Sequence, residues 1–197
     1  MRCCQFLKSI SVVLLLYSAN SAFAHCDTLD GPVVEAARVA LATMNLDPVL
    51  IWVQPEHEPE IRSAFEQTLD VRSLGVSARE LADMYFFETL VRLHREGEGA
   101  PYTGLKPAGT DFGPAIPAAD RALEFASPED VTELLADAVS MGLYEHFEDA
   151  LSKKEFDPAD VEAGRRYVAS YVEYIHYVER IYDAATSPAL HHFPEHE

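Results

Sequence analysis

The sequence is poor in basic residues and in cysteine, and it lacks several common catalytic motifs. Fifteen Lys and Arg residues stand against thirty-three Asp and Glu residues, so the formal net charge is -18 over 197 residues. A surface of this sign repels a phosphate backbone, which excludes nucleic acids as partners. The chain has no G-x-S-x-G, H-E-x-x-H, C-x-x-C, Walker or dinucleotide-binding motif. The hydrolase, zinc-protease, thiol-exchange and nucleotide sites that these motifs mark are therefore not expected.

One apolar run stands out, and it lies at the start of the chain. Arg2 and Lys8 flank the beginning of this run over residues 10–17, and small residues follow it up to Ala24. The run is too short to span a bilayer, and Ala22-Phe23-Ala24 fits the A-x-A site of signal peptidase. We therefore predict a signal peptide over residues 1–24, a periplasmic or secreted mature protein that begins at His25, and no stable membrane span.

Cleavage changes the cysteine count and the charge. Cys3, Cys4, Arg2 and Lys8 leave with the leader, so Cys26 becomes the only cysteine and 13 basic residues face 33 acidic ones. No intramolecular disulfide can form in such a chain. We expect one acidic domain over residues 25–187, followed by a histidine-rich tail over residues 188–197.

The mature chain is predicted to be all-α, because almost no alternation of apolar and polar residues favours strands. Residues 49–53 are either a buried helical turn or the one conceivable strand. The expected helix starts are Pro32, Glu58-Pro59, a Ser77/Glu80 capping box, Ser127-Pro128 and Asp157-Pro158. Four long helices and a few short ones indicate a helical bundle.

The last predicted helix carries a stripe of apolar residues at three- and four-residue spacing. These residues are Val168, Tyr171, Ile175, Val178 and Tyr182. Such spacing is typical of the face that a helix turns toward the protein core, so we predict that the stripe is buried.

A stretch rich in glycine and proline separates two of the predicted helices, over residues 96–117. Long irregular loops inside a compact domain are usually functional. Tyr102, Leu105, Phe112 and Ile116 give this loop apolar side chains with which to pack, so we favour an ordered loop over a mobile linker.

The predicted mature N-terminus, His25-Cys26-Asp27, has the composition of a metal chelator. The α-amine and imidazole of His25 can close one chelate ring, and the amide nitrogen and thiolate of Cys26 can close others. Mixed nitrogen and sulfur donors suit nickel and copper. The alternative is a frayed terminus, but a lone exposed thiol is a liability in an oxidising compartment. We therefore favour metal binding by His25 and Cys26.

These residues resemble the N-terminal hook of nickel superoxide dismutases, whose pattern is His-Cys-Asp-x-Pro-Cys-Gly-x-Tyr. His25, Cys26, Asp27 and Gly31 match, whereas Leu29, Asp30 and Val33 replace the proline, the second cysteine and the tyrosine. The resemblance implies that His25 and Cys26 are catalytic ligands of a redox-cycling nickel. The missing second thiolate leaves copper, or nickel without dismutase chemistry, as the alternative.

The mature chain as a whole also resembles a family of small secreted bacterial proteins of unassigned function that begin His-Cys-Asp. This second resemblance implies a helical fold and assigns no reaction.

Several other polar side chains are candidate metal ligands. Asp30 or Gly31 is expected to cap the helix that begins at Pro32, and Asp30 could instead donate an oxygen to the metal. His94 is expected to point inward near the glycine-rich loop, as a core histidine or as a ligand. His176 and Glu179 have the i, i+3 spacing of metal-binding bundles, with a solvated surface as the alternative. The histidine-rich tail would bind metals weakly or be incidental.

Three functions remain open from these residues. The first is a metalloprotein that binds nickel or copper and is superoxide dismutase-like, although whether it is an enzyme stays undecided. The second is a non-enzymatic protein that binds or delivers the metal. The third is a small-molecule or protein-interaction bundle, and a homo-oligomer is compatible with all three.

Overall fold

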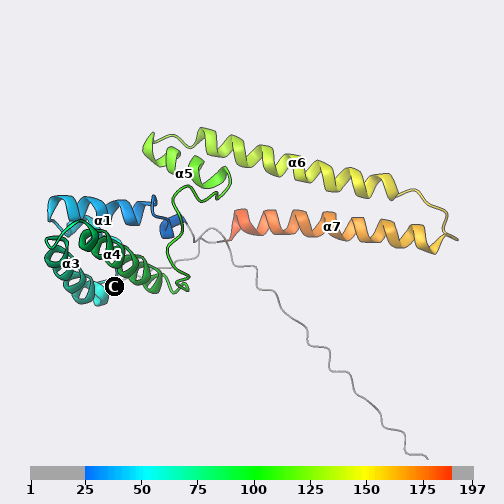
Figure 1. Cartoon of the computed structure of the whole chain (residues 1–197). Coiled ribbons are helices and arrows are strands. Elements are labelled where there is room, and N and C mark those ends of the chain that lie inside the picture. Colours follow the sequence, from blue (N-terminus) through cyan, green and yellow to red (C-terminus); the bar gives the residue numbers. More distant parts are fainter. Residues whose placement is uncertain (1–24, 188–197) are drawn as a thin grey trace, which may run out of the picture.

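The computed structural model describes residues 25–187, and this part of the chain is all-α (Figure 1). The predicted signal peptide and the histidine-rich tail lie outside the described residues. The elements in chain order are η2 (His25–Asp27), α1 (Pro32–Thr43), α2 (Asp47–Leu50), η3 (Pro55–His57), α3 (Glu58–Arg72), α4 (Val76–Gly97), α5 (Ala115–Glu124), α6 (Glu129–Lys153) and α7 (Val161–Thr186). None of these helices is both long and apolar enough to cross a membrane.

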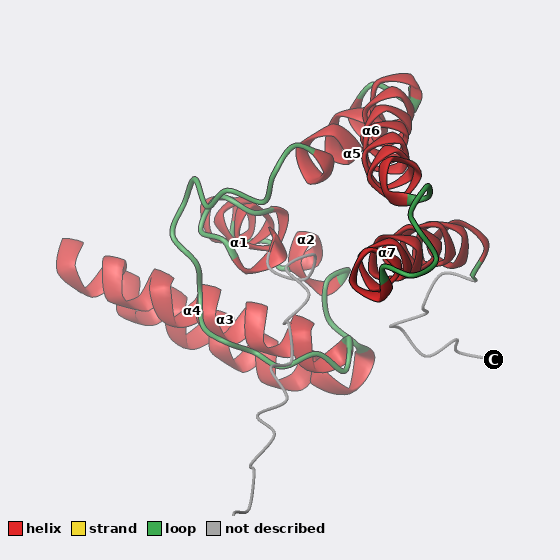
Figure 2. Cartoon of the chain, turned by 90° about the vertical axis from the view of Figure 1, so that its right-hand side faces the viewer, coloured by secondary structure: helices red, strands yellow, loops and turns green. Residues whose placement is uncertain are grey.

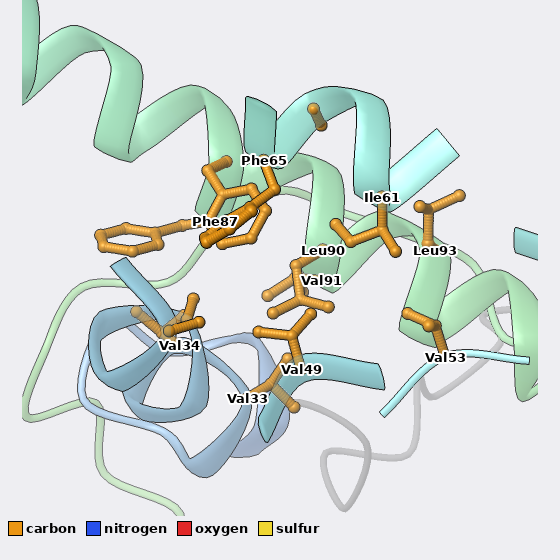
Figure 3. Close-up of a cluster of buried hydrophobic side chains, with 14 of the residues drawn as sticks. Val33, Val34, Val49, Val53, Ile61, Phe65, Phe87, Leu90, Val91 and Leu93 are labelled. Atoms are coloured by element: carbon orange, nitrogen blue, oxygen red, sulfur yellow. The ribbon is translucent and has the colours of Figure 1, made fainter. Parts of the chain in front are cut away.

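Helices α1 to α4 enclose the hydrophobic core (Figure 3). Pro32 starts α1, as predicted, because proline needs no hydrogen-bond donor in the first turn of a helix. Val33 and Val34 point from α1 into the cluster, and Ile61 of α3 and Leu90 of α4 meet them there with no exposed surface. The segment over 49–53 contributes Val49 from a short helix, so the strand alternative is excluded there.

The sequence placed most helix starts to within a few residues, with errors at the caps. No side chain caps α4, which begins at Val76 after Gly75, so the predicted Ser77/Glu80 capping box is wrong. Gly75 has a φ of 141°, a conformation that glycine adopts without strain. The last helix begins at Val161 rather than at Asp157, because the Asp160 carboxylate accepts the amide hydrogen of Ala163.

Helices α6 and α7 form a long hairpin that runs beside α5 and away from α1–α4 (Figures 1 and 2). The two helices have 25 and 26 residues, yet Ala150 and Ser170 are their only buried residues. The predicted core stripe of α7 is therefore wrong: its five members keep between 37% and 66% of their surface exposed.

A neighbouring face of α7 packs against α6 instead. Each of its members comes one residue before a member of the predicted stripe: Tyr167, Ser170, Tyr174, Tyr177 and Ile181. The ring of Tyr174 contacts Phe147 of α6, and the ring of Tyr177 contacts His146 of the same helix. Ser170 accepts a hydrogen bond from Lys153. One residue turns a helix by about 100°, so α7 has two adjacent apolar faces, and only one of them packs against another helix within residues 25–187.

Candidate metal centre at His25 and Cys26

The short turn η2 presents His25 and Cys26 at the edge of the core. Thr28 holds the turn closed, because its backbone and hydroxyl both donate to the carbonyl of His25, at 3.4 and 3.1 Å. Gly31 then donates to the carbonyl of Thr28 at 3.0 Å and leads into α1. The two residues predicted to chelate a metal are therefore anchored directly to the first core helix.

The glycine-rich loop lies against this turn and is ordered, as expected. Lys106 donates its backbone N–H to the carbonyl of Asp27 at 2.8 Å, and its own carbonyl accepts from Leu29 at 3.0 Å. The side chains of Tyr102 and Leu105 pack on the core cluster. The loop and the hook thus form one unit, joined by a short parallel bridge.

Asp30 makes a second contact with the glycine-rich loop. Gly31, not Asp30, occupies the N-cap position of α1, so the predicted capping role is wrong. The Asp30 carboxylate accepts the backbone N–H of Gly109 at 2.7 Å. This bond holds the pKa of Asp30 below its ordinary value. Asp30 therefore braces the loop; whether it also reaches a metal stays a prediction.

The imidazole of His25 is oriented by two later parts of the chain. Asp120 of α5 places Oδ2 3.4 Å from Nε2 of His25. Phe112 of the glycine-rich loop meets the same ring edge-on, with 5.7 Å between ring centroids. A carboxylate beside Nε2 favours a proton on that nitrogen, which leaves Nδ1 as the free lone pair. Nδ1 is the nitrogen that can close a chelate ring with the α-amine of the same residue.

Cys26 is half-buried and lies among carboxylates. Burial raises the pKa of its thiol to about 11, and the negative charges of Glu98 and Asp27 add to the effect. A thiol with such a pKa is protonated at neutral pH. It would become a metal ligand only by releasing a proton to solvent when the cation arrives.

A buried network of charged groups lies beneath the hook. Arg95 of α4 pairs with Asp27 at 3.3 Å and with Glu98 at 3.0 Å, and Asp27 and Arg95 are almost fully buried. Burial raises the pKa of Asp27, and Arg95 acts in the opposite direction. The network fixes Asp27, and with it the turn that carries Cys26.

His94 belongs to this network and points inward, as predicted. Its Nδ1 donates to the carbonyl of Trp52 at 2.9 Å, and its Nε2 lies 3.4 Å from Glu98. The ring is 3% exposed. Nδ1 thus has a hydrogen-bond partner, whereas the buried Nε2 has only the nearby carboxylate of Glu98 and no hydrogen bond within the described residues. The predicted role of His94 as a metal ligand remains untested.

His176 and Glu179 pair with each other on the solvent side of α7, with 2.9 Å between Nδ1 and Oε2. The groups that contact or act on His25 and Cys26 belong to η2, the glycine-rich loop, α4, α5 and the turn after α4. Within residues 25–187 no three His, Cys, Asp or Glu side chains form a preassembled metal cluster. Main-chain nitrogen donors of His25 and Cys26 would therefore have to complete a site at the hook.

The most informative residues that the sequence did not reveal are Asp120, Glu98 and Arg95. Asp120 lies 95 positions after His25, and nothing in its local pattern marks it. The pairing of Arg95 and Glu98 has the spacing of an ordinary surface salt bridge, and only their burial distinguishes it.

The helical part of the chain matches a known protein family. A family of unknown function, DUF6448, matches residues 30–177. The chain belongs to this family. The match spans α1 to most of α7 and begins after His25 and Cys26, so membership in DUF6448 accounts for the helical part and leaves the hook unassigned. No curated protein and no solved structure matches the chain.

The pKa of Cys26 predicts slow alkylation of the metal-free protein. Because only the thiolate reacts, iodoacetamide modification at pH 8 should be about 100-fold slower than for a free thiol with the ordinary pKa of 9.0. The rate should keep rising about tenfold per pH unit until about pH 11, and Glu98→Gln should raise it at pH 8. A plateau near pH 9 would show that neither burial nor the nearby carboxylates raise the pKa of Cys26.

Proposed function

We propose that the mature protein is a periplasmic or secreted metal-binding protein that holds one copper or nickel ion at its N-terminus. The ligands are the α-amine and Nδ1 of His25 and the amide nitrogen and thiolate of Cys26. These donors are contiguous in the chain, so no third side chain is required to form the first chelate rings. Signal cleavage before His25 would generate the α-amine and complete the set.

The position of Asp120 carries the proposal. Its carboxylate lies beside Nε2 of His25 and favours the tautomer with the proton on Nε2. In that tautomer Nδ1 has a free lone pair that can bind a metal. Imidazole ligands of metals commonly donate their other ring N–H to a carboxylate, and Asp120 lies at ion-pair distance from that nitrogen of His25. A frayed terminus would need no such partner, whereas a chelating histidine gains both orientation and basicity from it.

The charges around the hook favour capture of a cation. Asp120, Glu98 and Asp27 all act on the thiol of Cys26, and Arg95 opposes them. A field of this sign attracts Cu²⁺ or Ni²⁺ and repels an anion such as superoxide. We therefore propose binding or delivery of the metal as the function and retain superoxide dismutation as the alternative to be tested.

The test is a metal titration of the mature protein, with His25 confirmed as its first residue by mass. We expect one Cu²⁺ or Ni²⁺ per chain, at least about 100-fold weaker binding in Cys26→Ser, and about tenfold weaker binding in Asp120→Asn. Glu124→Gln, on the same helix as Asp120, is the matched control and should bind like the wild type. Affinity should also rise at least about 100-fold per pH unit near neutrality, because the Cys26 thiol and the Cys26 amide nitrogen each release a proton on binding.

Two further arms make the titration decisive. A chain that ends at residue 187 removes the histidine-rich tail and should keep the tight site. Equal affinity in the wild type and in Cys26→Ser would overturn the proposal. If the loaded protein accelerates superoxide decay and Cys26→Ser does not, the dismutase alternative replaces delivery as the function.

A further inference from the structure

The α6–α7 hairpin has an apolar face that nothing within residues 25–187 covers. We define the hairpin face as Tyr144, Phe147 and Leu151 on α6 with Val168, Tyr171, Ile175, Val178 and Tyr182 on α7. These side chains keep between 37% and 67% of their surface exposed. On α7 they recur every three or four residues over four turns, which is the pattern of a packing interface rather than of scattered surface residues.

Both helices turn these residues to the same side of the hairpin. One shallow groove is lined by Phe147 and Leu151 of α6 together with Tyr171 of α7. A second groove farther along is lined by Leu143 of α6 with Val178 and Tyr182 of α7. The face therefore extends over about 21 Å of α7, from Val168 to Tyr182, and over about 10 Å of α6, from Tyr144 to Leu151, at 1.5 Å per residue.

We propose that the hairpin face is a dimer interface and that its occupant is the same face of a second copy of this chain. Two hairpins packed face to face form a four-helix bundle, in which each helix has two neighbours on adjacent sides. Helix α7 has this property, because the face that packs on α6 and the hairpin face differ by one residue, or about 100°.

The exposed area fits a stable dimer. Eight large apolar residues with about half of roughly 200 Å² exposed on each present on the order of 800 Å² per copy. This equals the contribution of one partner to an interface of standard size, about 800 Å². Interfaces of this area have Kd values of about 1 μM or below.

The charges of α7 are placed to permit such pairing despite the acidity of the chain. Glu173, His176 and Arg180 lie on the opposite side of the helix from Ile175 and Val178, so a partner on the hairpin face would not bury them. A two-fold axis would place this apolar patch of one copy against the same patch of the other.

Sedimentation velocity on the mature protein tests this proposal. At about 10 μM the protein should have twice the mass of one chain. Ile175→Glu should raise the dimer dissociation constant at least about 100-fold, because the dimer would bury two new carboxylates. Ala169→Glu places the same charge on the polar side of the same helix and should remain dimeric. Unchanged circular dichroism of both variants, whose substituted positions are exposed in the single chain, excludes unfolding as the cause.

Two outcomes would overturn the dimer. A wild-type protein that is monomeric at about 100 μM would show that a second copy does not cover the face. A monomer whose sedimentation coefficient falls in Ile175→Glu and not in Ala169→Glu would show that the hairpin closes on its own chain instead.

Discussion

Replacing Arg95 with alanine should lower the free energy of unfolding by about 3–5 kcal/mol. The substitution leaves Asp27 and Glu98, with side chains 1% and 13% exposed, without the guanidinium that now pairs with both. An unpaired carboxylate in a buried position costs more than the ion pair contributes. For a chain of this size the melting temperature should fall by roughly 10 °C, measured by circular dichroism.

The control for Arg95→Ala is Arg92→Ala, three residues earlier on the same helix. Arg92 pairs with Glu60 and Glu96, but all three side chains are more than a third exposed, so the loss should be at most about 1 kcal/mol. The Arg95→Ala penalty should also shrink as the pH falls toward 4, because burial raises the pKa of Asp27 and a protonated carboxyl needs no partner. Equal effects of the two substitutions would contradict the view that a buried charge network supports the hook.

Replacing Gly31 with alanine should displace the hook itself. A methyl group at this position would lie 2.4 Å from the carbonyl oxygen of His25 and 2.8 Å from the hydroxyl of Thr28. The first of these atoms belongs to the backbone, so the turn η2 must move to make room. We expect a loss of stability of about 1–3 kcal/mol and, in the metal titration, binding at least about tenfold weaker than in the wild type.

Gly164→Ala in α7 is the matched control for Gly31→Ala. There a methyl group would meet only the ring of Phe156, at 3.0 Å, and a side chain can give way. Alanine is also the better helix former, so the stability should stay the same or rise by up to about 1 kcal/mol. Metal affinity in Gly164→Ala should equal that of the wild type. If Gly31→Ala also binds like the wild type, the position of η2 does not matter for the site.

The helices could be predicted from the sequence because their signals are local. Pro32 and Pro59 mark helix starts through the geometry of proline, and apolar spacing identifies the helical stretches between them. The role of α7 could not be predicted, since periodicity shows that a stripe will pack against something and not whether the partner is in the same chain. Their spacing alone predicts that Val168 and Ile175 face the core. In the structure the adjacent stripe, which includes Tyr174 and Tyr177, makes the contact with α6.

Some residues of the candidate site could likewise be predicted from the sequence, and others could not. His25 and Cys26 could be found because adjacency in the chain is itself the chelating geometry. Asp120 and Glu98 could not, because they reach the hook only through the path of the glycine-rich loop and the packing of α4 and α5. Asp30 was visible as a polar residue beside a helix start, yet its partner, the backbone of Gly109, lies 79 residues away.

The most direct measurement compares metal binding by two forms of the mature protein that differ by one residue. In one form His25 is the first residue, and in the other a single alanine precedes it and moves the α-amine out of reach of the imidazole. We expect the first form to bind one Cu²⁺ or Ni²⁺ tightly by native mass spectrometry and the extended form to bind at least about 100-fold more weakly. Equal binding by the two forms would contradict the N-terminal hook as the metal site of this protein.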